Sequence, residues 1–194
     1  MDLILLQPGD KSIFPTDNSW GTGGSLVDKA GLSMPTIAGK AVEFGNCIEL
    51  VSVHQGMKQQ VTTDVSNSAR TSGRPVITEF TCVKYVDRTS VKLYDRCLRA
   101  ETIGKDAGAP SYIYILRNSG DKTYNIITFA LRDALISEIQ FQSHPDDMPT
   151  EQFKLNFSEI LWTYNVQLAN MQVKGNVAAG WSLARNRPIT QFTA

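Results

Sequence analysis

The chain has 194 residues, of which 42% are hydrophobic and 20% charged, and this composition predicts a folded domain rather than a disordered chain. Nineteen basic and nineteen acidic residues balance to zero, so a nucleic-acid-binding surface, which needs a basic excess, is not expected. No window approaches the roughly 20 apolar residues of a membrane span, so membrane insertion is not expected either. The opening MDLILLQPGD also lacks the basic start of a signal peptide.

The N-terminal part alternates short strand patterns with long polar segments. The apolar run at 2–6 predicts a first strand, and strand patterning resumes at 48–54. Residues 9–45, which contain SWGTGGS, and residues 55–74 are predicted as long loops, because neither shows a helical or strand period. Loops of this length inside a compact domain are usually functional or mobile.

A strand and the one convincing helix follow. Residues 76–85, VITEFTCVKY, are rich in β-branched and aromatic side chains and predict a strand. Thr89 or Ser90 can cap a helix that should end near Gly104. Five residues fall on one face of that helix at helical spacing, and they are Val91, Leu93, Tyr94, Cys97 and Leu98. We therefore expect a short amphipathic helix packed against a sheet.

The second half of the chain reads as strands. Residues 112–117 and 124–142 predict two of them, the second long, alternating and bent near Asp133. Apolar parity switches between 153–157 and 160–166, which predicts a β-bulge near Ser158–Glu159. Residues 175–183 supply the partner strand. Its Trp181, with Trp162 and Tyr164, should anchor the core within the chain.

These elements predict a mainly β fold, a small closed antiparallel β-barrel with one short external α-helix and long loops. We expect a single domain over residues 1–194 that ends in a short tail, 187–194. The tail, with Arg185 and Asn186 before it, is expected to reach toward a neighbouring subunit.

Residues suited to catalysis or metal binding do not gather in the sequence. His54 and His144 lack metal-ligand spacing, and the adjacent Asp146 and Asp147 would face opposite ways on a strand. The segment GTGGS lacks the lysine of a phosphate-binding loop. The three cysteines have no CxxC spacing and read as reduced core residues. We expect no enzyme activity, no cofactor and no metal.

The order of motifs along the chain resembles the Hcp family, the tube protein of bacterial type VI secretion systems. KYVDRTSVKLYDRCL precedes the long alternating strand, and MPTEQFKLNFSEILWTYN and KGNVAAGWSLARN follow it. The resemblance covers roughly residues 46–186, and residues 9–45 depart from it in being longer and richer in glycine. The matching positions are Lys84, Tyr85, Asp87, Thr89, Ser90, Leu93, Cys97, Pro149-Thr150-Glu151, Trp162-Thr163-Tyr164, Gly180-Trp181 and Asn186.

The resemblance implies a barrel subunit that assembles into homohexameric rings, which stack into a tube inside a contractile sheath. It implies a VgrG-like spike, baseplate and sheath components, and effector proteins in the lumen as partners. It also implies synthesis in the bacterial cytoplasm and secretion through the apparatus without a cleaved signal peptide. A phage or phage-like tail tube subunit and a small-ligand-binding β-barrel remain as alternative functions.

Two sets of residues are candidates for roles in such a tube. The segments around 17–45 and 55–74 should act between stacked rings, because loops at the end of a barrel project along its axis. The candidate residues in the second segment are Met57, Gln59, Val61 and Val65. A lumen that carries varied cargo needs a polar wall. The polar side of the long strand offers Thr128, Arg132, Glu138 and Gln140 for it.

Overall fold

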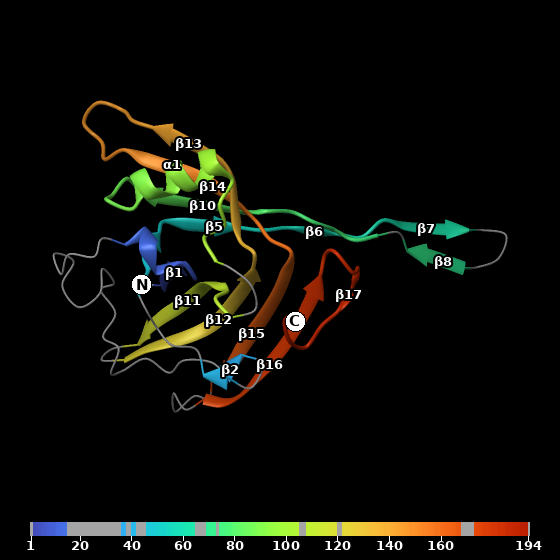
Figure 1. Ribbon diagram of the computed structural model, residues 1–194. Coiled ribbons are helices and arrows are strands. Elements are labelled where there is room, and N and C mark those ends of the chain that lie inside the picture. Colours follow the sequence, from blue (N-terminus) through green and yellow to red (C-terminus); the bar gives the residue numbers. More distant parts are fainter. Residues whose placement is uncertain are drawn as a thin grey trace.

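The computed structural model describes residues 2–14, 36–37, 40–41, 46–64, 69–72, 74–104, 108–119, 122–167 and 173–193. Within these ranges the chain is mainly β, with one α-helix, and the strand pairs of both main sheets are antiparallel (Figure 1). The predicted mainly β, antiparallel fold with one short helix is thereby confirmed, while the strand pairing of the described residues does not show the predicted closed barrel.

The larger sheet has seven strands and contains the first and the last strand of the described chain. Its order is β17 (Arg187–Pro188), β16 (Val173–Ser182), β15 (Glu159–Gln167), β12 (Lys122–Arg132), β11 (Ser111–Ser119), β1 (Asp2–Gln7) and β4 (Ile48–Leu50). The predicted pairing of the tryptophan strand with the last long strand is confirmed by β15 and β16.

The smaller sheet has four strands, and three of them, β5, β13 and β14, follow or precede a strand of the larger sheet directly in the chain. Its order is β13 (Leu135–Gln142), β14 (Thr150–Asn156), β10 (Phe80–Tyr85) and β5 (Ser52–His54). The chain passes between the sheets in three places: at residue 51, at 133–134 and at 157–158. Strands that cross between two sheets through bends form the corners of barrel-like folds.

Two of these corners correct the predicted strands. The long strand expected over 124–142 is two strands, β12 and β13, in different sheets, because Asp133 takes a left-handed φ of 51° and turns the chain. The parity switch near Ser158 is likewise a corner between β14 and β15 and not a bulge within one strand. The backbone N–H of Ser158 donates to the Arg132 carbonyl at 3.1 Å, which ties the two corners together.

The main hydrophobic core lies between the two sheets. Leu6, Ile48 and Ile160 face it from the seven-stranded sheet, and Phe80 and Phe153 face it from the four-stranded sheet. A second apolar cluster lies on the opposite side of the larger sheet, with Leu5, Tyr114 and Leu161 among its residues. Since neighbouring residues on a strand point to opposite faces, both Leu5 and Leu6 are buried, which explains the continuous apolar run of β1.

Helix α1 (Ser90–Arg99) is the predicted helix, with Thr89 at its N-cap and Ala100 ending it in the left-handed conformation. Of the five residues expected on its buried face, Leu93 is fully buried, and Tyr94 and Cys97 are partly buried. Val91 is mostly exposed and Leu98 is 88% exposed. The helix therefore packs through a narrower stripe than its apolar pattern predicts.

The sequence predicts a loop over 55–74, but the described residues of this segment contain strands that form part of a β-hairpin arm, which projects from the body (Figure 1). Near its base β6 (Met57–Lys58) pairs with β9 (Val76–Ile77), and farther out β7 (Val61–Asp64) pairs with β8 (Ala69–Ser72). VTTD and ARTS have only Val61 and Ala69 as apolar residues, so sequence alternation did not reveal the strands.

The predicted loop over 9–45 lies mainly outside the described residues. Two short elements are described within it, the 3₁₀-helix η1 (Lys11–Ile13) and the pair β2 (Thr36–Ile37) and β3 (Lys40–Ala41).

Candidate assembly surfaces

A buried polar network fastens helix α1 to the four-stranded sheet. Lys84 on β10 and Glu151 on β14 face each other in register, with Nζ and Oε1 2.8 Å apart and no exposure of either side chain. The Ser90 hydroxyl donates to Glu151 Oε1 at 2.8 Å, and the Tyr94 hydroxyl donates to Oε2 at 2.6 Å. Asp87 lies 3.1 Å from the Lys84 ammonium at the edge of the network. The helix and two strands thus share one set of ionic contacts.

This network is structural, because its central charges are enclosed and paired. Burial, with the bond to the Glu151 carboxylate, raises the pKa of Tyr94 to about 12. Lys84, Asp87, Ser90 and Glu151 are among the positions that match the Hcp-like order of motifs in the sequence, but nothing in that order predicts a buried network among them. A signal was present: Lys84 shares the parity of buried Phe80 and Cys82 along β10.

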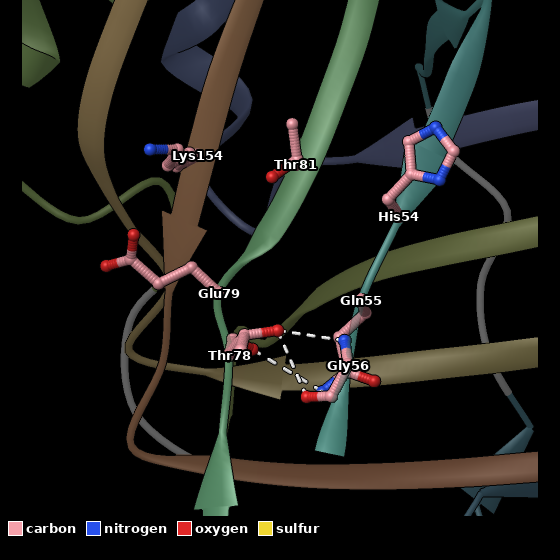
Figure 2. Close-up of a pocket in the computed structure, with 7 residues that line it drawn as sticks. All are labelled: His54, Gln55, Gly56, Thr78, Glu79, Thr81 and Lys154. Atoms are coloured by element: carbon pink, nitrogen blue, oxygen red, sulfur yellow. Dashed lines mark hydrogen bonds between the residues drawn. The ribbon is translucent and has the colours of Figure 1, made fainter. Parts of the chain in front are cut away.

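At the root of the arm, Thr78 clamps the two strands that lead out of the body (Figure 2). Its hydroxyl accepts from the Gly56 N–H at 2.8 Å, and its own N–H donates to the Gly56 carbonyl at 2.9 Å. The Gln55 amide also donates to the Gly56 carbonyl, at 3.1 Å. A polar pocket of about 350 Å³ lies beside this clamp, with His54, Glu79, Thr81 and Lys154 also in its lining. The clamp fixes where the arm leaves the sheet.

On the adjoining apolar side, the base of the arm meets the two tryptophans of the larger sheet. We call this cavity of about 300 Å³ the tryptophan pocket; its lining is Met57, Lys58, Gln59, Pro75, Ile77, Trp162 and Trp181. Three of the four candidates for ring stacking can be located: Met57 and Val61 are more than half exposed, and Gln59 is exposed. Val65 lies outside the described residues.

The three residues expected to anchor the core differ in their surroundings. Trp162 and Trp181 are partly buried and pack against the main core while also lining the tryptophan pocket. Tyr164 is 48% exposed and pairs across strands with Val177, which is also exposed, so it is not a core residue of the subunit. The aromatic face of β15 runs from the core into an open apolar surface.

The four candidates for a lumen wall do not lie on one face. Thr128 is fully buried on β12 and accepts a hydrogen bond from the Asn125 amide at 2.6 Å, so it cannot line a hydrated wall. Arg132, at the end of the same strand, is largely buried. Glu138 and Gln140 lie on β13 in the four-stranded sheet, where Glu138 pairs with Lys154 at 2.5 Å. Only these last two present polar groups on an exposed sheet face.

Residues 185–193 fold back onto their own chain instead of extending away from it. The Arg132 guanidinium donates to the Thr193 hydroxyl at 2.6 Å, and Thr193 donates from its N–H and hydroxyl to Glu159 at 2.9 and 2.8 Å. Burial disfavours ionisation of Glu159, but hydrogen bonds from Thr193, Ser182 and Arg132 outweigh it and hold its pKa below the ordinary value. The tail therefore packs against the seven-stranded sheet of its own subunit.

Other residues with reactive side chains are dispersed. Cys47 and Cys82 are buried and Cys97 is partly buried, all as free thiols, and burial raises the pKa of Cys82 to about 12. His54 is exposed on β5, and His144 lies in the turn between β13 and β14. Over the described ranges, no three metal-ligating side chains gather. No helix in those ranges has the length and apolarity to cross a bilayer.

Comparison with solved structures shows the same fold in bacterial secretion proteins. "Structure of a type six secretion system protein" matches with a TM-score of 0.74 at 19% identity, covering 97% of this chain and 100% of the other. Hcp1 from Salmonella typhimurium matches with a TM-score of 0.64 at 17% identity over 97% and 99%. Hcp3 from Pseudomonas aeruginosa matches with a TM-score of 0.51 at 16% identity over 94% and 99%.

Among curated proteins no match was found. The sequence model of the family described as "Type VI secretion system effector, Hcp" matches residues 32–164, which is more than half of the chain. That span includes the arm, helix α1 and the whole four-stranded sheet. The chain therefore belongs to the Hcp family of type VI secretion system effectors.

Proposed function

We propose that the chain is a non-enzymatic structural subunit that forms homohexameric rings, and that these rings stack into the inner tube of a type VI secretion system. The observation that carries the proposal is the match of residues 32–164 to the Hcp family. The similarity of the fold to several Hcp structures over nearly the whole chain supports it.

Ring closure is assigned to the edges of the four-stranded sheet. β13 and β5 are its outer strands, so each presents backbone groups on its open side. The open sides belong to different strands, and pairing β13 of one subunit with β5 of the next is a head-to-tail contact, which closes into a ring when the rotation fits. Six copies then form one continuous inner sheet.

The lumen wall is assigned to the exposed face of that sheet. Glu138 and Gln140 from the predicted set lie there, and cross-strand pairing continues the row from Glu138 through Lys154 and Thr81 to His54. Amide, hydroxyl and paired charged groups make a hydrated surface that binds folded proteins weakly. We place effector proteins against this face.

The arm is assigned to contacts between rings. It leaves the end of the four-stranded sheet and carries Met57, Gln59 and Val61 into solvent; Val65 belongs to the same segment. A few half-exposed apolar side chains give a modest contact, at about 1.5–3 kcal/mol for each one fully buried. Stacking should therefore depend on protein concentration.

The remaining partners and the route of export complete the proposal. A VgrG-like spike would sit at the tip of the tube, with baseplate and sheath components at its base and around it. The chain would be made in the bacterial cytoplasm and leave through the apparatus without a cleaved signal peptide.

Native mass spectrometry of the purified full chain, followed by negative-stain microscopy, tests the ring. Six-membered rings with an open centre are expected. A chain that stays monomeric at micromolar concentration would exclude the proposal.

A further inference from the structure

Two surfaces of unlike chemistry lie at opposite ends of the four-stranded sheet. In the pairing of β10 with β14, Tyr85 faces Thr150 at one end and Phe80 faces Leu155 at the other. The turn between β13 and β14 is at the Tyr85 end, and the arm departs from the Phe80 end. Figure 1 shows the hairpin of β13 and β14 and the arm pointing in opposite directions.

The surface at the arm end is the tryptophan pocket, which is apolar inside and bordered by cations. Lys58 lines it, and Arg74, next to Pro75 of the lining, donates to the Leu183 carbonyl. Arg185 is exposed in the same turn as Leu183, and it lines a separate pocket with Arg187 and residues 188–193. Within the described residues neither Lys58 nor Arg185 forms an ion pair. The nearby acid Glu79 accepts from Asn156 and lines the polar pocket instead.

The surface at the other end, which we call the acidic tip, comprises residues 141–148. Phe141 is 60% exposed and Met148 is 62% exposed, and Asp146 and Asp147 lie exposed between them. The sequence has no lysine or arginine from residue 133 to residue 153. The tip therefore combines apolar side chains with negative charge, the complement of an apolar pocket bordered by cations.

We propose that the acidic tip of one copy of this chain docks into the tryptophan pocket of a second copy. Met148 and Phe141 supply apolar surface for Trp162 and Trp181, while Asp146 and Asp147 approach the cationic border. Opposite charges around an apolar centre fix orientation and speed encounter, which suits a contact that must form repeatedly in one direction.

The inference rests on the proposed tube and specifies how its rings meet. Since the strand edges are used within a ring, the ends of the strands face the neighbouring rings. A tip at one end and a pocket at the other make the stack head-to-tail. All rings in the stack would then point in the same direction along the tube axis.

A charge exchange tests the contact with the full chain. One variant carries Asp146→Lys and Asp147→Lys, a second carries Lys58→Glu and Arg185→Glu, and a third carries all four changes. Arg74 is left intact because it holds the Leu183 carbonyl. Each single-surface variant should need at least about tenfold more protein to pellet as stacked rings, and the four-change variant should recover toward the unaltered chain.

Cysteine pairs add a positional test. With Cys97 replaced by serine, Met57→Cys and Met148→Cys in one chain should oxidise to a covalent ladder longer than six chains. The matched control pairs Met148→Cys with Val177→Cys, which should not form the ladder. Val177 is an exposed site on β16, the strand that carries Trp181, but it is not in the lining of the pocket. A ladder that stops at six would place the contact within a ring and overturn the proposal.

The experiments can refute the contact between rings without refuting the proposed ring. If all variants form hexamers and pellet like the unaltered chain, or if the four-change variant pellets no better than the single-surface variants, the contact is refuted and the ring stands. If the unaltered chain forms no hexamer, the ring and the contact are both refuted.

Discussion

At the scale of single residues, the ionic pair of Lys84 and Glu151 holds helix and sheet together. Removing one partner leaves the other as a buried charge without a counter-ion, so Lys84→Ala should lower the free energy of unfolding by about 3–5 kcal/mol. Replacing both at once, with Lys84→Met and Glu151→Leu, should cost much less, because no fully buried charge is left unpaired and Asp87 is 37% exposed.

Chemical denaturation followed by tryptophan fluorescence measures both variants. Lys92→Ala on the exposed face of α1 is the control and should stay within about 0.5 kcal/mol of the unaltered chain. Equal stability of Lys84→Ala and the control would show that the pair does not hold the helix.

Glu159 gives the fold a dependence on pH. Its pKa is lower in the folded chain than in the unfolded one, so its ionised form stabilises the fold at neutral pH. This contribution begins to decrease as pH falls below the ordinary value of 4.5, and it is lost as pH falls through the lower pKa of the folded chain. Thr193→Ala removes a hydrogen bond from the carboxylate, so its pKa should rise and the fold should lose stability at neutral pH.

The Glu159 pKa can be followed by NMR, together with the unfolding free energy at neutral and at acidic pH. The difference between Thr193→Ala and the unaltered chain should shrink as Glu159 becomes protonated. Thr190→Ala, in the same tail but without a hydrogen bond to Glu159 among the described contacts, serves as control. An unchanged Glu159 pKa in Thr193→Ala would contradict this role of the tail.

At the scale of elements, the β15 and β16 pair joins a core to an open surface. Trp162 is only partly buried, so Trp162→Ala should cost about 2 kcal/mol, below the roughly 3–5 kcal/mol of fully buried aromatic residues. Tyr164→Ala, at the exposed end of the same strand, should change the melting temperature little. Equal losses in the two variants would mean that the strand has no such gradient of burial.

The arm is the element that the sequence describes least well. Replacing residues 59–72 with a short Gly-Ser linker should leave the hexamer intact and abolish stacking into tubes, because the Thr78 clamp and the sheet edges remain. Mass measurement and microscopy of the same sample separate the two effects. Normal tube formation by this variant, or normal secretion from cells, would remove the arm from stacking.

The elements recovered from the sequence are those whose burial leaves a pattern in the residues. Burial on one side leaves an apolar period in β10, the β15 and β16 pair and helix α1, and burial on both sides leaves an apolar run in β1 and β11. The sequence predicted only a bend at Asp133, because the alternation of apolar and polar residues continues through this position. In the structure the chain passes there from one sheet to the other. The strands of the arm were missed because a hairpin with few apolar residues shows no apolar period.

The predicted assembly residues show the same limit. Parity along a strand identified polar positions but not what covers them, so Thr128 and Arg132 were grouped with Glu138 and Gln140 although the first two are buried or nearly so. Parity could have revealed Lys84 and Glu151, each a charged residue in an apolar series. The tryptophan pocket joins β15 and β16 to the arm, and no local pattern predicts that contact.

At the scale of the whole molecule, two sheets joined through shared corners present three kinds of surface. Open strand edges lie at the sides of the four-stranded sheet, a polar face lies across it, and unlike apolar and charged surfaces lie at its two ends. A ring uses the edges, a lumen uses the face, and a stack uses the ends. This division follows from one antiparallel sheet with a hairpin at each end.

The central claim is the closed ring, and the mass of the free assembly tests it most directly. Native mass spectrometry of the full chain at micromolar concentration should give one main species at six times the 21.4 kDa of the chain. That species should persist in the variant without the arm. A monomer, or a ladder of sizes without a preferred closed number, would contradict the account.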